Sequence, residues 1–250
     1  MVPNSTGSNA TGSKGLVVFI HGFMGNPSQF SKFEAFVNDH GFESTSLLLP
    51  GHGGPLREFS KSTAAQWQGY VLDQVRQLAQ SYGEVWLAGH SMGGLLALNA
   101  AIELESSVSG VCVIASPFKL ALFSAKANKT RLRYIFYRGK NPIKTALMAR
   151  TGIRFSPRVV VRIIKPFREL RRLMRSTRAV LPRVRKPVTA VYSHSDELSA
   201  FASLGILKSG LSGAPLRELV LTDSLHALFP DNEQAQIEQA LLELLERAVV

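Results

Sequence analysis

The chain has 250 residues, of which 45% are hydrophobic, and a formal net charge of +11 at pH 7. This size and composition suit one sizeable core, so we expect one domain over 15–250, after a flexible polar tail at 1–14. The sequence has no run of about 18 apolar residues that would form a membrane-spanning helix, and it begins without the basic and apolar regions of a signal peptide. The single cysteine, Cys112, allows no intramolecular disulfide. These features favour a cytoplasmic protein.

The positive charge is concentrated in one segment. Residues 119–186 contain 21 of the 29 Lys and Arg residues but a single acid, Glu169, which gives a net charge of +20, whereas the rest of the chain has 8 basic and 17 acidic residues. The overall basicity alone would suggest a nucleic-acid-binding protein. Its distribution instead indicates a mildly acidic domain that carries a very basic insert, so we do not expect a nucleic-acid partner.

Short apolar runs and helical periodicity alternate along the chain. Strands are expected at 16–20, 44–49, 85–88, 110–115, 188–192 and 217–221. Helical spacing of apolar residues predicts helices at 27–40 and 63–82 and a last one from 231 onward, and Thr63 with Gln66 is a candidate capping box. Strands that alternate with helices predict an α/β fold with a mainly parallel, doubly wound sheet of about six strands.

The basic segment, 117–186, interrupts this alternation. It has no clear strand, and its apolar residues recur at helical spacing between many arginines. Pro166 is expected to break or kink the helix that this spacing predicts. We interpret the segment as a helical cap inserted over the carboxyl edge of the sheet, where ligands bind in open α/β folds.

The stretch from Glu84 to Leu98 contains the most informative motif. An apolar strand at 85–88 leads into Gly89-His90-Ser91-Met92-Gly93, and a helix is expected at 94–101. Strand, G-x-S-x-G turn and helix are the context of a nucleophile elbow, in which a strained turn presents the serine hydroxyl. The sequence therefore predicts Ser91 as a nucleophile.

A serine nucleophile needs a histidine base that an acid orients. If the order along the chain is Ser, Asp, His, the base lies late, and His226 follows the last predicted strand. His194 and Asp196 both follow the fifth predicted strand. At this position we prefer Asp196 as the acid to His194 as the base. The alternative acids are Glu197 and Asp223.

An ester or thioester carbonyl under attack also needs backbone N–H donors for its developing oxyanion. The N–H of the residue after the nucleophile, Met92, is one candidate. The other is Phe23, with Met24 next, in the loop after the first strand. His21 and His52 are expected to brace loops, and His90 inside the elbow is expected to be structural.

These motifs together resemble those of α/β-hydrolase-fold serine hydrolases, in particular compact carboxylesterases and monoacylglycerol lipases. The shared patterns are HGF after the first strand, LPGHG after the second, and GHSMGG at the elbow, and the resemblance covers 15–117 and 187–250. It implies an α/β-hydrolase fold with no metal or cofactor. The residues that it implies are Ser91 as nucleophile, Asp196 as acid, His226 as base, and Phe23 with Met92 as oxyanion donors.

The function that this implies is hydrolysis of a carboxylic ester, with a small molecule or lipid as substrate. A thioesterase, an acyltransferase or a C–C hydrolase could use the same residues, and a non-catalytic protein that binds membranes or partners is the alternative outside enzymes. The charge of 117–186 could serve contact with an anionic membrane, steering of an anionic substrate such as a lysophospholipid or an acyl-CoA, or a solvated or partner-binding surface. The apolar residues among the arginines favour peripheral contact with an anionic membrane over a plain charged surface.

Overall fold

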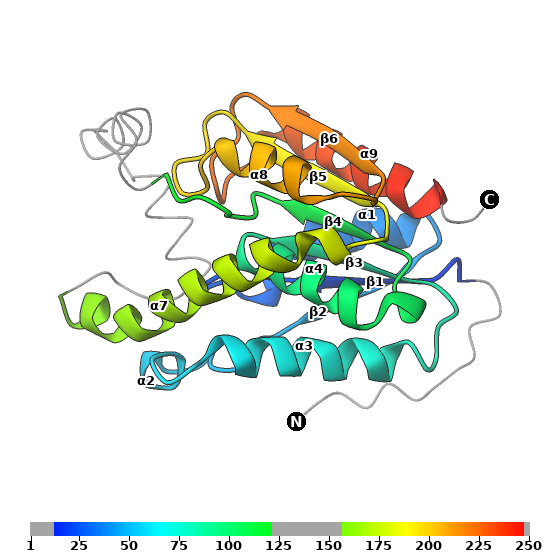
Figure 1. The fold of residues 1–250 in the computed structure, drawn as a ribbon. Helices are drawn as coiled ribbons and strands as arrows, with labels where there is room; N and C mark the ends of the chain where they lie inside the picture. The colour runs from blue at the N-terminus through cyan, green and yellow to red at the C-terminus, as the bar shows by residue number, and fades with distance from the viewer. Residues whose placement is uncertain (1–12, 122–156, 248–250) are drawn as a thin grey trace.

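A six-stranded parallel sheet forms the centre of the protein in a computed structural model, which describes residues 13–121 and 157–247 (Figure 1). Its strands follow the order β2-β1-β3-β4-β5-β6. They are β1 (Leu16–Ile20), β2 (Glu43–Leu47), β3 (Val85–His90), β4 (Gly110–Ile114), β5 (Val188–Ser193) and β6 (Leu216–Leu221). All five pairs of neighbours are parallel, which confirms the predicted sheet.

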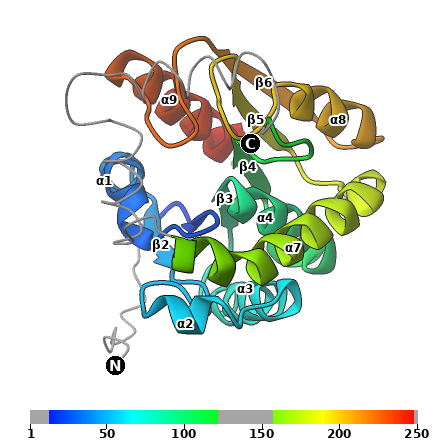
Figure 2. The ribbon, with the colours of Figure 1, turned by 90° about the vertical axis from the view of Figure 1, so that its left-hand side faces the viewer.

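Helices cover both faces of this sheet, as Figure 2 shows from the side. The α-helices are α1 (Ser31–Asp39), α2 (Leu56–Phe59), α3 (Ala64–Leu78), α4 (Met92–Glu103), α7 (Pro157–Val180), α8 (Ala202–Gly210) and α9 (Asp231–Arg247). Short 3-10 turns are η1 (Pro27–Phe30), η2 (Glu105–Ser107) and η3 (Leu181–Arg183). Helices α1 and α9 lie on one face, and α3, α4, α7 and α8 lie on the other (Figure 1).

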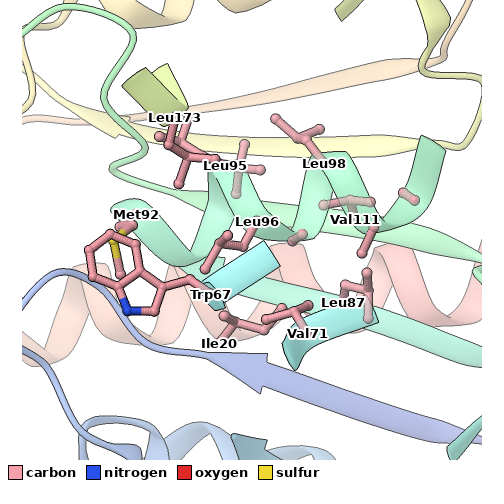
Figure 3. Packing of buried hydrophobic residues seen from close by; sticks show 14 of the residues in the cluster. Ile20, Trp67, Val71, Leu87, Met92, Leu95, Leu96, Leu98, Val111 and Leu173 are labelled. Carbon is pink, nitrogen blue, oxygen red and sulfur yellow. The ribbon is translucent and has the colours of Figure 1, made fainter. Parts of the chain in front are cut away.

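The larger core lies between the sheet and α4, with α3 and α7 packed outside that helix. Figure 3 shows Trp67 of α3 and Leu173 of α7 meeting Met92 and Leu95 of α4 above Ile20 of β1. These side chains are at most 2% exposed, so α4 is buried on several sides. Burial on several sides explains why its sequence is apolar almost throughout and shows little amphipathic periodicity.

Several boundaries differ from the predicted ones. The helix after the elbow begins at Met92 instead of Gly94, because the turn itself supplies its first residues. The predicted helix at 27–40 divides into η1 and α1, and the second strand ends at Leu47. The capping box at Thr63 is confirmed, since its hydroxyl accepts the Gln66 N–H and the Gln66 side chain accepts the Thr63 N–H.

The helix of the basic cap was predicted to break or kink at Pro166. It does not break there, because α7 includes the proline within its 24 residues. Tertiary contacts hold the helix on both sides of it. Before the proline, Lys165 donates to Lys61 O at 3.0 Å. After it, Glu169 accepts the first N–H of α3, that of Ala64, at 3.3 Å. Residues 122–156 of the predicted cap lie outside the described residues, as does most of the predicted tail.

Along the described parts of the chain, no helix combines the length and the hydropathy that crossing a membrane requires. Helix α7 is long enough, but its arginines make it far too polar.

Candidate active site

Ser91 lies in a strained turn between β3 and α4. Its φ of 55° and ψ of −120° place a non-glycine residue in the left-handed half of backbone space. The strain is held by close packing, because a Cβ on Gly93 would lie 1.9 Å from Ile20 O and one on Gly89 would lie 2.4 Å from the Gly93 backbone. The two glycines of the motif are therefore required where helix and strands approach each other.

Asp196, His226 and Ser91 form one chain of hydrogen bonds at the carboxyl edge of the sheet. His226 Nε2 lies 2.9 Å from Ser91 Oγ, and His226 Nδ1 lies 2.9 Å from Asp196 Oδ2. All three side chains are buried. This geometry puts the Nδ1 proton toward the carboxylate and lets the Nε2 lone pair accept the serine proton.

The acid loop after β5 holds the Asp196 carboxylate in place. Its Oδ1 accepts the N–H groups of Leu198 and Ser199, both at 2.8 Å. These two backbone donors fix the orientation of the carboxylate toward the histidine. The same loop pairs with the start of the cap segment, where Leu120 and Ser199 form an antiparallel bridge.

The alternative acids lie elsewhere. The carboxylate of Glu197 accepts the backbone N–H of His226 at 3.0 Å, so it holds the histidine loop and does not contact the ring through this bond. Asp223 accepts a hydrogen bond from the Thr222 hydroxyl at the surface. His194 is exposed, and its ring lies 3.9 Å from that of Phe201 between centroids.

Glu233, in the first turn of α9, anchors the loop that carries His226. Its carboxylate accepts the N–H groups of Thr222, Asp223 and Ser224 at 2.8, 3.0 and 2.7 Å, and also the Ser224 hydroxyl. Burial alone would raise the pKa of Glu233, but these hydrogen bonds outweigh it and lower the pKa to about 2. His90 adds a further tie, because its Nε2 lies 2.7 Å from His226 O.

Sequence reasoning missed the roles of Glu233 and Glu197 in holding this loop. Glu233 follows a proline at the start of a helix, where acids are common for electrostatic reasons. Nothing in the sequence distinguishes it from Asp231, the other acid of that turn. Its burial is the distinguishing property, at 3% exposure, and burial depends on the folded loop.

The loop after β1, residues 21–25 and here called the oxyanion loop, packs directly against the elbow. A Cβ on Gly22 would lie 2.9 Å from Ser91 Cβ. Met24 has a φ of 56°, and its N–H donates to His52 Nε2 at 3.2 Å. The Met24 N–H is therefore engaged, whereas no described residue accepts the Phe23 N–H in a loop or turn hydrogen bond. Of the two predicted donors in this loop, the geometry favours Phe23.

Two neutral histidines brace the oxyanion loop, as expected from the sequence. His21 Nε2 accepts the Leu49 N–H at 3.1 Å, and its Nδ1 lies 2.9 Å from Gly22 O. His52 has the same tautomer, with Nδ1 3.2 Å from Pro50 O. Burial lowers the pKa of His52 to about 4 against the opposing effect of nearby carbonyl groups, so the ring stays an acceptor at neutral pH.

An aromatic cluster adjoins this loop. The ring of Phe23 lies 5.0 Å from Phe59, 6.4 Å from Trp67 and 6.3 Å from Phe167 between centroids. Because Phe167 belongs to α7, the basic helix reaches Phe23, the predicted oxyanion donor.

Fold and site together define an α/β hydrolase. Residues 17–240 match the alpha/beta hydrolase family, and the chain belongs to that family. It is 25% identical over 233 residues to a thermostable monoacylglycerol lipase from Bacillus sp. (strain H-257), a match that covers 91% of this chain and 88% of that protein. It is 36% identical over 109 residues to 2-succinyl-6-hydroxy-2,4-cyclohexadiene-1-carboxylate synthase from Escherichia coli O8 (strain IAI1), across 41% of this chain and 39% of that one.

Solved structures share the fold. A metagenome-derived lipolytic enzyme superposes with a TM-score of 0.73 at 22% identity, covering 94% of this chain and 95% of that one. A soluble variant of monoglyceride lipase from Saccharomyces cerevisiae gives a TM-score of 0.69 at 18% identity, covering 96% and 89%. The protein is thus a hydrolase of this family, with lipases and esterases among its relatives.

Proposed function

We propose that the protein hydrolyses carboxylic esters through an acyl-enzyme on Ser91, as a carboxylesterase or monoacylglycerol lipase. The observation that supports this is the buried hydrogen-bonded chain from Asp196 through His226 to Ser91. A structural serine needs neither a base at 2.9 Å nor a strained backbone. In a nucleophile elbow both serve catalysis, because the base activates the serine and the strained turn exposes its hydroxyl.

In the proposed reaction Ser91 Oγ attacks the ester carbonyl carbon while its proton passes to His226 Nε2. The carbonyl oxygen becomes an oxyanion that the N–H groups of Phe23 and Met92 bind. The bond from carbon to the alcohol oxygen then breaks, and His226 gives its proton to that oxygen. Water attacks the acyl-enzyme by the same route, releases the carboxylic acid, and restores the Ser91 hydroxyl. Asp196 holds the ring and stabilises its charged form throughout.

Monoacyl esters with an apolar chain are the substrates that we propose. The aromatic cluster around Phe23 supports an apolar acyl group, and a relative that matches 91% of the chain is a monoacylglycerol lipase. Hydrolysis of p-nitrophenyl esters of increasing chain length, and of a monoacylglycerol, tests this directly. A preference for an acyl-CoA, or transfer of the acyl group to an added alcohol in place of water, would contradict it in favour of a thioesterase or an acyltransferase.

Covalent labelling with a fluorescent fluorophosphonate tests the nucleophile. We expect the wild type to be labelled and Ser91→Ala to be neither labelled nor active. Ser116→Ala is the matched control, because the Ser116 hydroxyl is buried beside Gly94 of the elbow helix. Labelling that survives in Ser91→Ala, or a wild type that stays unlabelled, would refute the proposal.

A further inference from the structure

One face of α7 points away from the protein and presents a continuous stripe. Its residues follow one another three and then four positions apart, which keeps them on one side of a helix. They are Val161, Ile164, Arg168, Arg171, Arg175 and Arg178. All six are exposed, and α7 lies at the outside of the molecule in both views (Figures 1 and 2). We call this set the outer stripe.

The opposite side of α7 is firmly docked. Leu170, Leu173 and Met174 are buried in the main core. Farther along the helix, the Thr177 hydroxyl accepts a hydrogen bond from Asn99 Nδ2 at 2.6 Å. The direction of the outer stripe is therefore fixed by packing, and its cations are held in a row on a rigid element.

The cations of the outer stripe have no acidic partners among the described residues. In the part of α7 whose side chains are described, Arg172 pairs with Glu169, and no ion pair joins Arg168, Arg171, Arg175 or Arg178 to a described residue. Surface arginines of a folded domain commonly have acids nearby. A row of four cations without them is suited to an external anionic surface.

The end of the stripe is apolar. Val161 is 68% exposed and Ile164 is 51% exposed, and they are two of the five large hydrophobic side chains that are exposed among the described residues. A nucleic acid offers its phosphates to cations but gains little from two exposed aliphatic side chains. A bilayer surface offers both anionic headgroups and an apolar layer beneath them.

We propose that the outer stripe of α7 docks on an anionic lipid bilayer. Arg168, Arg171, Arg175 and Arg178 meet the headgroups, while Val161 and Ile164 enter the boundary between headgroups and acyl chains. Phe167, next to Arg168 but turned toward the protein, lies by Phe23 of the oxyanion loop. Docking would therefore hold the candidate active site close to a surface that contains lipid esters.

Sedimentation of the full-length protein with vesicles tests this surface, using phosphatidylcholine alone or mixed with phosphatidylserine. We expect the mixed vesicles to bind the wild type at least about tenfold more tightly than the neutral ones, since each cation near an anionic surface contributes several-fold. The first variant removes the four cations of the outer stripe by Arg168→Gln, Arg171→Gln, Arg175→Gln and Arg178→Gln. It should bind the mixed vesicles at least about tenfold more weakly than the wild type does.

A second variant removes the same number of charges elsewhere and should bind like the wild type. It carries Lys32→Gln, Arg76→Gln, Lys208→Gln and Arg247→Gln, which are exposed on four other helices. A third, with Val161→Gln and Ile164→Gln, should bind normally at low salt and lose binding as salt screens the charges.

Three results would overturn the proposal. One is equal recovery of the wild type in the supernatant with both kinds of vesicle. Another is an equal loss of vesicle binding in the fourfold arginine variant of α7 and in its charge-matched control, which would show that only the net charge matters. The third is binding to a single-stranded RNA without binding to vesicles. Ser91→Ala should sediment like the wild type, so this test does not depend on the proposed ester chemistry.

Discussion

Replacing His52 with phenylalanine tests whether this ring positions the oxyanion loop. His52 Nε2 accepts the Met24 N–H at 3.2 Å. Phenylalanine would keep an aromatic ring beside Phe59 and Trp67, whose centroids lie 4.8 and 5.9 Å from that of His52. The substitution therefore removes the acceptor while it preserves most of the packing.

The expected magnitude has two parts. A buried N–H that loses its acceptor costs about 1–3 kcal/mol, so the free energy of unfolding should fall by that amount. A loop released from His52 would misplace the Phe23 N–H. Complete loss of one oxyanion donor lowers kcat by about 10²–10³, and a partial displacement should lower it by about 10- to 100-fold with KM little changed.

The variant should also change the pH dependence of stability. Burial lowers the pKa of His52 from 6.5 to about 4, so the unfolded chain takes up this proton before the folded one does. The contribution of His52 to stability is complete above pH 6.5 and is lost as pH falls through about 4, which amounts to about 3 kcal/mol. Phenylalanine does not titrate, so His52→Phe should lack this loss.

Steady-state hydrolysis of a p-nitrophenyl ester, together with urea unfolding at several pH values, measures all three effects. His52→Gln is the control, since its side-chain amide can still offer one acceptor and one donor and should restore part of kcat. A His52→Phe variant with the kcat of the wild type would refute the positioning role, even if its stability fell.

Three further substitutions test other parts of the site. Asp196→Asn should lower kcat by about 10³–10⁴ and leave fluorophosphonate labelling of Ser91 very slow, because the amide favours the wrong histidine tautomer. Glu233→Gln should lose up to about 3 kcal/mol of stability at neutral pH, and the difference from the wild type should vanish as pH falls from about 4.5 to about 2, as urea unfolding would show. Gly93→Ala should lower the free energy of unfolding by about 1–3 kcal/mol or more, because its Cβ would lie 1.9 Å from Ile20 O. Its urea midpoint should fall accordingly, and an unchanged midpoint would contradict the packing argument.

The central strands could be predicted because they are buried on both faces and read as short apolar runs. Strands β1, β3 and β4 are buried at every position. Strand β2 lies at the edge of the sheet, where most of its residues are only half-buried, and its predicted bounds of 44–49 differ from the observed Glu43–Leu47 at both ends. Burial on both faces of the sheet thus produces the continuous apolar runs from which strands are most easily predicted.

The candidate triad could be predicted because parallel strands bring their carboxyl ends to one edge. Ser91, Asp196 and His226 each lie within five residues after the end of a strand, so topology places them near one another. The supporting carboxylates could not be predicted in this way. Whether Glu197 faces the histidine ring or its backbone depends on the path of two loops, and no periodic pattern encodes that path.

The orientation of α7 is a second feature that periodic patterns do not predict, and one residue of the helix explains which face is buried. Apolar residues occur on both sides of its first described turns, with Ile163 and Phe167 packed on the core and Ile164 exposed, so hydrophobic periodicity alone does not choose the buried face. Glu169 distinguishes the faces. A carboxylate is favoured at the positive end of a helix, and its bond to the Ala64 N–H turns its own side of α7 toward α3. The single acid of the basic segment therefore helps to direct the arginines outward. The charge pattern of α7 thus contributes both to its packing against α3 and to its basic outer surface.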